Sequence, residues 1–375
     1  MNHFQPLARL FDVTYSYRGE LLQEGITMRR PLVRRLTALA AAAIFLPAAA
    51  ACGSGDSTGE SGAKGGTSPL VIYSGRQQAL VKPLLAKLEK AVGAKVQVRY
   101  GDSAELSAQL LEEGDRTKAA LFFSQDAGAL GALSKEKRLA KLPQATLDKV
   151  APAYRSANGD WTGVSGRARV IAYHPDKTPE VPGSVRDLVE PEWKGKVGYA
   201  PTNASFQAFV TGMRVLDGDD ATRTWLKGLK ANGAKAYAHN IAVLDAVESG
   251  EVSVGLVNHY YWYERVAEKG ADKVKAKLHF PRGGDPGALV NVAGVGVLKG
   301  SGESEQARKA VEFLLSKEAQ TYFAEDTKEY PLAAGVTSSV KDLPSLDSLD
   351  SPKIDLARLD SLRDTLAMLQ DVGLV

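Results

Sequence analysis

The sequence of 375 residues lacks the features that mark most enzymes. It holds no Gly-rich phosphate loop, no HExxH or CxxC element and no nucleophile elbow, and its five histidines are scattered. With one cysteine, Cys52, the chain can form no internal disulfide. The missing motifs argue against an enzyme and favour a binding protein.

An excess of charge of one sign is also missing from most of the chain. The formal net charge is +3, but the first 51 residues hold six arginines and three acidic residues, which leaves 41 basic and 41 acidic residues in the remainder. Such a balance argues against a nucleic-acid-binding protein, which would carry a basic surface. The remainder, about 300 residues long, exceeds a typical single domain, so two lobes are expected.

The N-terminal stretch has the pattern of an export signal. Met28 is followed by four arginines and then by an almost wholly apolar run over residues 36–51. At about 15 residues, this run is short for a membrane span and typical of a signal peptide. We therefore interpret residues 1–51 as a signal peptide whose true start is Met28.

Cys52 lies directly after this run, behind small residues that suit a signal peptidase. A lone cysteine is more often a small buried apolar residue, but this position and the Gly/Ser-rich tract after it favour attachment of a lipid. Residues 52–69 lack apolar periodicity and predict a flexible tether. The sequence thus predicts a secreted protein that the lipid on Cys52 anchors to the outer face of the cytoplasmic membrane.

From residue 70 onward, short apolar strands alternate with helices. A strand at 70–73 precedes apolar residues at helical spacing over 80–92, and Gly93 stops that helix. Asp102, with Glu105 three residues later, predicts a capping box at the start of a second helix. The alternation predicts an α/β fold with two lobes, each a doubly wound, mainly parallel sheet with flanking helices.

Two longer strand-like segments, 163–173 and 289–298, are able to cross between the lobes as a two-strand hinge. Apolar residues near helical spacing over 354–374 predict a closing helix at the C-terminal end. The expected division is residues 70–166 with 291–342 for the first lobe, and 167–290 with 343–375 for the second.

Polar residues follow the strands of the second lobe where helices are expected to begin: Asn203, Ser205, Asn240 and Asn258. Each could be no more than a helix cap. However, unpaired N–H groups and the helix dipole at such starts favour an anion. Because ligands bind at the carboxyl ends of the strands in open α/β sheets, these loops are candidates for the binding site.

Eight segments together resemble those of a known family: YSGRQ (73–77), GDSAELSAQLLEEG (101–114), SGRARV (165–170), WKGKVGY (193–199), WLKGLKANG (225–233), NHYYWYE (258–264), DPGALV (285–290) and EYPL (329–332). Over residues 70–335, the chain resembles the bacterial ferric-ion-binding solute-binding proteins of ABC iron importers, which are transferrin-like and have the type 2 periplasmic-binding-protein fold. The resemblance implies a two-lobed Venus-flytrap fold that takes up ferric iron in its cleft. It also implies the permease of an ABC iron importer as a partner.

In this family a pair of adjacent tyrosines holds the metal, and by position these are Tyr260 and Tyr261. Fe(III) is a hard, highly charged ion that favours anionic oxygen, so phenolate is a suitable donor. The family also binds a small carbonate- or phosphate-like anion beside the iron. By position, its contacts here are Arg167, Asn203, Ala204, Ser205, Asn240 and Asn258. We expect a monomer, with no nucleic acid as a partner.

This chain departs from the family at two positions. Well-known members supply a histidine from the first loop and a glutamate from the third, where this chain has Gln77 and Gln125. These two residues and Asp126, which could equally cap a helix, are weaker metal-ligand candidates, and Asp102 and His259 are weaker still. Because these two ligands, the histidine and the glutamate, are missing, the alternative is a solute-binding protein for an anion, a phosphonate or a polyamine. The tyrosine pair argues against it, since such capture does not require two adjacent tyrosines.

Overall fold

The computed structural model describes residues 68–375. The signal peptide expected at 1–51 and the lipidation site Cys52 lie outside the described residues, as does nearly all of the tether expected at 52–69. Among residues 68–375, no helix is both long enough and apolar enough to cross a membrane.

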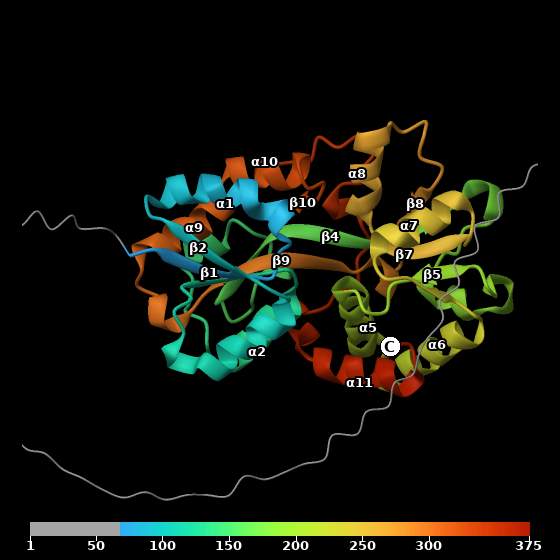
Figure 1. Ribbon diagram of the computed structural model, residues 1–375, viewed down its shortest axis with the longest axis horizontal. Coiled ribbons are helices and arrows are strands. Elements are labelled where there is room, and N and C mark those ends of the chain that lie inside the picture. Colours follow the sequence, from blue (N-terminus) through green and yellow to red (C-terminus); the bar gives the residue numbers. More distant parts are fainter. Residues whose placement is uncertain (1–67) are drawn as a thin grey trace, which may run out of the picture. The chain divides into compact units, whose positions relative to one another are not determined.

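Ten strands of the described chain form one sheet, in the order β2-β1-β3-β9-β4-β7-β5-β6, with β8 and β10 each paired to β4 (Figure 1). Their bounds are β1 Leu70–Ser74, β2 Val96–Tyr100, β3 Leu121–Ser124, β4 Trp161–Tyr173, β5 Val197–Tyr199, β6 Lys235–Ala236, β7 Val254–Asn258, β8 Lys277–His279, β9 Val290–Val297 and β10 Tyr330–Pro331. The outer strands pair in parallel, whereas β4 and β9 are antiparallel to each other and to their neighbours β7 and β3. The predicted α/β fold of two lobes is confirmed, with antiparallel strands in the middle of the sheet.

The α-helices of the described chain are α1 Gln78–Val92, α2 Ser103–Glu113, α3 Ala127–Lys135, α4 Gln144–Leu147, α5 Ala204–Asp217, α6 Asp219–Ala231, α7 Asn240–Ser249, α8 His259–Lys269, α9 Glu305–Leu314, α10 Lys317–Glu325 and α11 Leu362–Val372. As predicted, α1 ends at Gly93, whose φ of 68° suits a residue without a Cβ. Asp102 caps α2 by accepting a hydrogen bond from the N–H of Ala104 at 2.8 Å. Because this bond goes to the second residue of the helix and not to the third, the predicted capping box with Glu105 is wrong.

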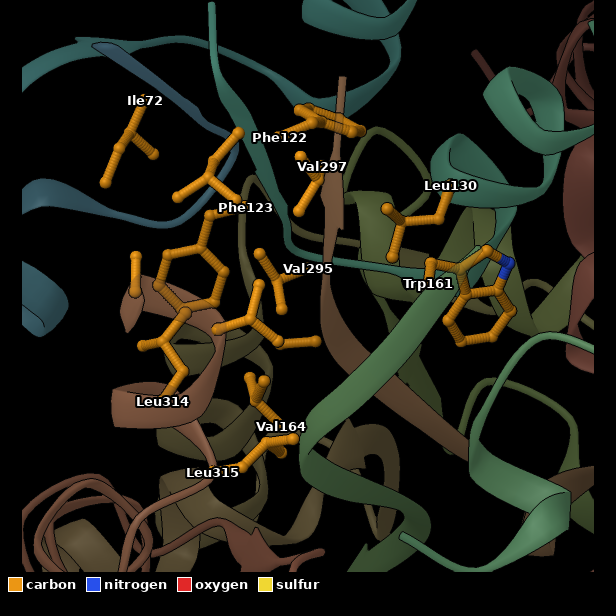
Figure 2. Packing of buried hydrophobic residues seen from close by; sticks show 14 of the residues in the cluster. Ile72, Phe122, Phe123, Leu130, Trp161, Val164, Val295, Val297, Leu314 and Leu315 are labelled. Carbon is orange, nitrogen blue, oxygen red and sulfur yellow. The ribbon is translucent and has the colours of Figure 1, made fainter. Parts of the chain in front are cut away.

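The two segments expected to cross between the lobes are the long strands β4 and β9. Residues 161–168 of β4 pair with β9, and residues 169–173 pair with β7, so one strand belongs to both halves of the sheet. Each half buries its own apolar side chains. Figure 2 shows part of the first cluster, around Phe122 and Phe123, and Trp225 belongs to a cluster in the second half. Two packed lobes therefore share the crossing strands.

The C-terminal tail contacts both lobes. The helical segment predicted over 354–374 consists of a 3₁₀ helix, Leu356–Asp360, followed by α11. Leu359 packs in the cluster of the first lobe, whereas the apolar face of α11 packs in the second. Gly128 of α3 permits this close approach, because a Cβ there would lie 2.3 Å from the backbone oxygen of Leu359. The tail, expected at 343–375 in the second lobe, is thus divided between the two.

Candidate functional site

A cavity of about 460 Å³ lies at the carboxyl ends of the strands, between the two halves of the sheet. The loops after β1, β2 and β3 line one wall, the starts of α5 and α8 line the other, and β4 contributes two arginines. Eleven of the predicted site residues line this cavity: Gln77, Asp102, Gln125, Asp126, Arg167, Asn203, Ala204, Ser205, Asn258, Tyr260 and Tyr261. Asn240 does not line it. Its amide nitrogen instead donates to Asn203 Oδ1 and Ser205 Oγ, each at 3.0 Å, so it supports two residues that do.

Tyr260 and Tyr261 lie side by side in the first turn of α8. Their ring centroids are 4.2 Å apart and their planes differ by 33°. Tyr260 is buried and Tyr261 is half-buried. Burial raises the pKa of Tyr260 well above 10, Tyr261 raises it further, and the Arg167 guanidinium opposes the shift. The Tyr260 phenol is therefore protonated at neutral pH unless a cation displaces the proton.

The next two aromatic residues of α8 have partners outside the cavity. Trp262 Nε1 donates to the backbone oxygen of Ala276 at 2.6 Å, and the Tyr263 hydroxyl donates to the backbone oxygen of Asp342 at 2.9 Å. Neither residue lines the cavity. The motif therefore contributes its first two aromatic rings to the site and uses the next two for packing.

Arg167 and Arg169 face the cavity from the same side of β4, because they lie two residues apart on a strand. Arg167 is buried, and its Nη2 donates to the backbone oxygen of Gln125. Its Nε lies 3.8 Å from Glu329 Oε1. Arg167 thus connects the crossing strand to the loop after β3, which carries two of the weaker ligand candidates.

Arg169 is a site residue that the sequence reasoning missed. It is 2% exposed, and its guanidinium carbon lies 5.8 Å and 5.2 Å from the ring centroids of Phe206 and Phe209. It forms no ion pair with a carboxylate of residues 68–375, but it donates to the backbone oxygen of Leu256 at 2.9 Å and to Ser205 Oγ at 3.4 Å. Burial lowers its pKa to about 9, and Tyr261 and Tyr260 oppose this shift. The pattern Arg-Ala-Arg in a predicted strand was the signal that could have placed it beside Arg167.

A buried ion pair supports the arginine side of the cavity. Arg76 lines the cavity and donates to both carboxylate oxygens of Glu329, at 3.0 Å and 2.7 Å. The Ser165 and Thr327 hydroxyls donate to the same carboxylate at 2.9 Å and 3.1 Å. Burial alone would raise the pKa of Glu329, but Arg76 outweighs it and holds that pKa below its ordinary value. Glu329 is therefore ionised at neutral pH and fixes the arginines beside it.

The weaker ligand candidates provide one carboxyl and two amides. Gln77 is exposed directly before α1, and Gln125 has a buried Oε1 without a hydrogen-bond partner among the described residues. Asp126 accepts from the N–H of Ala129 at 3.0 Å and so caps α3. Burial raises the pKa of Asp126. The wall opposite the tyrosines therefore offers amides and carboxyl groups whose oxygens also serve as helix caps.

The two weakest candidates have other roles. Asp102 lines the cavity, but it caps α2. His259 does not line it, because its Nδ1 accepts from the N–H of Ala168 at 3.1 Å and its Nε2 donates to the backbone oxygen of Lys328 at 3.0 Å. Burial lowers the pKa of His259 to about 4. Within residues 68–375, no group of three or more His, Cys, Asp or Glu side chains is placed to hold a metal ion.

The three expected helix starts differ in their caps. Asn203 Oδ1 accepts from the N–H of Ser205 at 3.0 Å and caps α5. The cap of α7 is His239, whose Nδ1 accepts a backbone N–H at 3.1 Å, so Asn240 is the first residue inside that helix and not its cap. Asn258 precedes α8 and makes no side-chain capping bond. The first N–H groups of α8, beside the tyrosine pair, therefore remain suited to an anion.

Comparisons with known proteins agree with this geometry. A family model described as bacterial extracellular solute-binding protein matches residues 116–358. The Fe(3+)-binding periplasmic protein of Serratia marcescens is 36% identical, over 82% of this chain and 90% of the relative. The major ferric iron-binding protein of Neisseria meningitidis serogroup B is also 36% identical, over 81% of this chain and 93% of the relative. The crystal structure of iron-bound HitA from Pseudomonas aeruginosa superposes with a TM-score of 0.75 at 36% identity, over 81% of this chain and 99% of that one.

Proposed function

The chain belongs to the ferric-ion-binding branch of the bacterial extracellular solute-binding proteins, and we propose that it binds Fe(III) through the phenolates of Tyr260 and Tyr261 for delivery to an ABC importer. Proteins of this family bind a substrate for transport and are not enzymes. The observation that carries the proposal is the tyrosine pair, with ring centroids 4.2 Å apart in a cavity that buried arginines also line.

The chemistry of the cavity suits a ferric ion bound by phenolates. Fe(III) favours hard, anionic oxygen donors. Each phenolate that forms places a negative charge near Arg167 and Arg169, whose burial makes a nearby anion favourable. Asp126 and the amides of Gln77 and Gln125 are weaker ligands. The remaining coordination positions of the metal then belong to an exogenous anion or to water.

A carbonate- or phosphate-like anion completes the site in this proposal. The support comes from Arg169, a buried guanidinium without a carboxylate partner among the described residues, and from the uncapped start of α8. A planar guanidinium suits the geometry of such anions. The proposed contacts are Arg167, Arg169, Asn203, Ala204, Ser205 and Asn258, with Asn240 supporting them through its hydrogen bonds.

The proposal also gives the protein a location and a partner. It is a monomer, held at the outer face of the cytoplasmic membrane by a lipid on Cys52, and it passes iron to the permease of an iron importer. The support is the signal-like run followed by Cys52 and a Gly/Ser-rich tract. Cys52→Ala should move the protein from the membrane to the soluble fraction with unchanged ferric binding. Retention on membranes after high-salt washing would contradict the lipid anchor.

A visible spectrum of the purified protein with ferric citrate tests the central claim. Phenolate-to-iron charge transfer is coloured, so the proposal predicts a band that grows to one iron per chain. The buried guanidinium of Arg169, without a carboxylate partner among the described residues, specifically favours a second candidate, a protein that captures an anion such as a phosphonate without iron. In that case calorimetry would show anion binding while the spectrum stayed colourless.

A further inference from the structure

The residue directly before the tyrosine pair is attached to two other parts of the fold. The imidazole of His259 is fully buried, and both of its nitrogens are used. Nδ1 accepts from Ala168, in the middle of the crossing strand β4, at 3.1 Å. Nε2 donates to the backbone oxygen of Lys328, just before β10, at 3.0 Å. One ring therefore connects the start of α8 to β4 and to a turn of the first lobe.

The same turn holds the arginine side of the cavity. Lys328 has a φ of 55°, the left-handed region that is uncommon for a residue with a Cβ. Glu329 forms the buried ion pair with Arg76, and the ring of Tyr330 lies 4.7 Å from the ring of His259. Three consecutive residues thus contact the imidazole on one side and a guanidinium of the cavity on the other.

Two later side chains of α8 also bond to other segments, since Trp262 donates to Ala276 and Tyr263 to Asp342, but His259 is the residue directly before the tyrosine pair. Asn258, in the cap position, makes no side-chain hydrogen bond to the helix. The His259 ring packs edge-on against Tyr260, with 6.0 Å between centroids, and against Tyr263, with 6.1 Å. The bonds of His259 therefore act on the first residue of α8, directly before the two tyrosines that line the cavity.

We infer that His259 is a positioning residue, which fixes the first turn of α8 so that the Tyr260 and Tyr261 oxygens face Arg167 and Arg169. It does not touch the ligand, because both of its nitrogens are used and it does not line the cavity. This inference rests on the proposed function, since it assigns His259 a role in the geometry of the phenolate site. Partners that orient metal ligands in this way typically change metal affinity by roughly 10- to 100-fold when they are removed.

Three substitutions of His259 test its two side-chain hydrogen bonds together and one at a time. His259→Phe keeps the ring packing and removes both hydrogen bonds. His259→Asn retains an acceptor near the place of Nδ1, and His259→Gln retains a donor that can reach the place of Nε2. The matched control is His174→Phe, because His174 is also buried, lies just beyond the end of β4 in the second lobe and does not line the cavity.

The readouts are ferric affinity by competition with citrate, the wavelength of the charge-transfer band, and the melting temperature of the ligand-free protein. We expect His259→Phe to lose roughly 10- to 100-fold in affinity and to shift the band. His259→Asn and His259→Gln should show smaller losses of ferric affinity. If His259→Phe does not fold, these two variants test the inference in its place. His174→Phe should lower the melting temperature and leave affinity and band unchanged.

Two results would overturn the inference, and they are distinguishable. If the folded His259 variants melt at lower temperature but bind iron with wild-type affinity and an unshifted band, His259 is a packing residue only. If the wild-type protein itself shows no charge-transfer band, the phenolate site is wrong and the role of His259 falls with it.

Discussion

Arg76 and Glu329, 253 residues apart in the sequence, form a bidentate ion pair with N–O distances of 3.0 Å and 2.7 Å and with both side chains fully buried. The pair joins the loop after β1 to the turn before β10. A buried ion pair gives little net stability compared with apolar packing, but the removal of one partner leaves an uncompensated charge in the interior. The pair is therefore a sensitive point of the first lobe.

We expect Glu329→Gln to destabilise the ligand-free protein by about 3–5 kcal/mol, because it leaves the Arg76 guanidinium buried without a counter-charge. Denaturant unfolding followed by circular dichroism measures this loss. The matched control is Glu318→Gln, which removes an exposed ion pair with Lys87 (3.2 Å) and should have a much smaller effect. Equal losses in the two variants would show that the buried pair has no special role.

The difference in unfolding free energy between wild type and Glu329→Gln should depend on pH with a defined sign. The pKa of Glu329 in the folded protein is below its ordinary value of 4.5, with Arg76 the main cause that lowers it against the effect of burial. The pair therefore stabilises the fold fully above about pH 4.5, and this contribution is lost as the pH falls through the lowered pKa. The gap between wild type and Glu329→Gln should be constant near neutral pH and should shrink in acid.

Local patterns in the sequence were sufficient to predict several helices and strands and part of the candidate site. The apolar spacing and Gly93 predicted α1 with its end, and the long strand-like segments predicted β4 and β9. The tyrosine pair could be predicted as part of the site because a specific motif surrounds it, and both residues line the cavity. Such features depend on neighbours within a few residues, which the sequence displays directly.

The residues that support the site could not be predicted in the same way. Glu329 meets Arg76 only because β10 pairs with β4 beside the loop after β1, a contact between distant segments. The two bonds of His259 also go to distant backbone groups, so its residue type alone suggested a weak metal ligand instead. The position of Arg169 could be predicted from the sequence, because strand alternation places it on the same face as Arg167.

The guanidinium of Arg169, which has no carboxylate partner among residues 68–375, gives a prediction about the anion. Arg169→Met should weaken ferric binding in the presence of phosphate by about 1.5–3 kcal/mol, the usual value of a hydrogen bond to a charged group, and should make the affinity nearly independent of phosphate concentration. Ferric titrations at several phosphate concentrations measure both effects. Arg265→Met is the matched control, because Arg265 lies on α8 outside the cavity and pairs with Asp245 and Glu248. A phosphate dependence that survives in Arg169→Met would place the anion elsewhere.

The crossing strands β4 and β9 lead to a prediction about motion. We propose that residues 70–166 with 291–342 rotate against residues 167–290 with α11 when ligand fills the cavity between them. Small-angle scattering should then show a smaller radius of gyration with iron and anion than without. The variant that carries both Tyr260→Phe and Tyr261→Phe is the control and should stay open. An unchanged radius in the saturated wild type would contradict closure.

The tyrosine pair gives the sharpest prediction about the ligand. Tyr260→Phe and Tyr261→Phe each keep a ring in place and remove one anionic donor, so each should lose most of the ferric affinity and bleach or shift the charge-transfer band. Tyr263→Phe is the matched control from the same helix, because its hydroxyl donates to a backbone oxygen outside the cavity. Gln77→Ala and Gln125→Ala should also have far smaller effects than either change in the pair.

The release of protons on iron loading provides an independent test of whether the Tyr260 and Tyr261 oxygens are the ligands. The pKa of Tyr260 lies well above 10 because of burial, so iron must displace a proton that is firmly held at neutral pH. Ferric affinity should therefore fall as the pH falls, and loading should release protons that a weakly buffered titration detects once the pH dependence of the citrate competitor is subtracted. Tyr260→Phe should release fewer protons per iron bound than Tyr263→Phe. If Tyr260→Phe and Tyr261→Phe both bind iron and release protons like wild type, the phenolates are not the ligands. Anion capture then becomes the better account of the cavity.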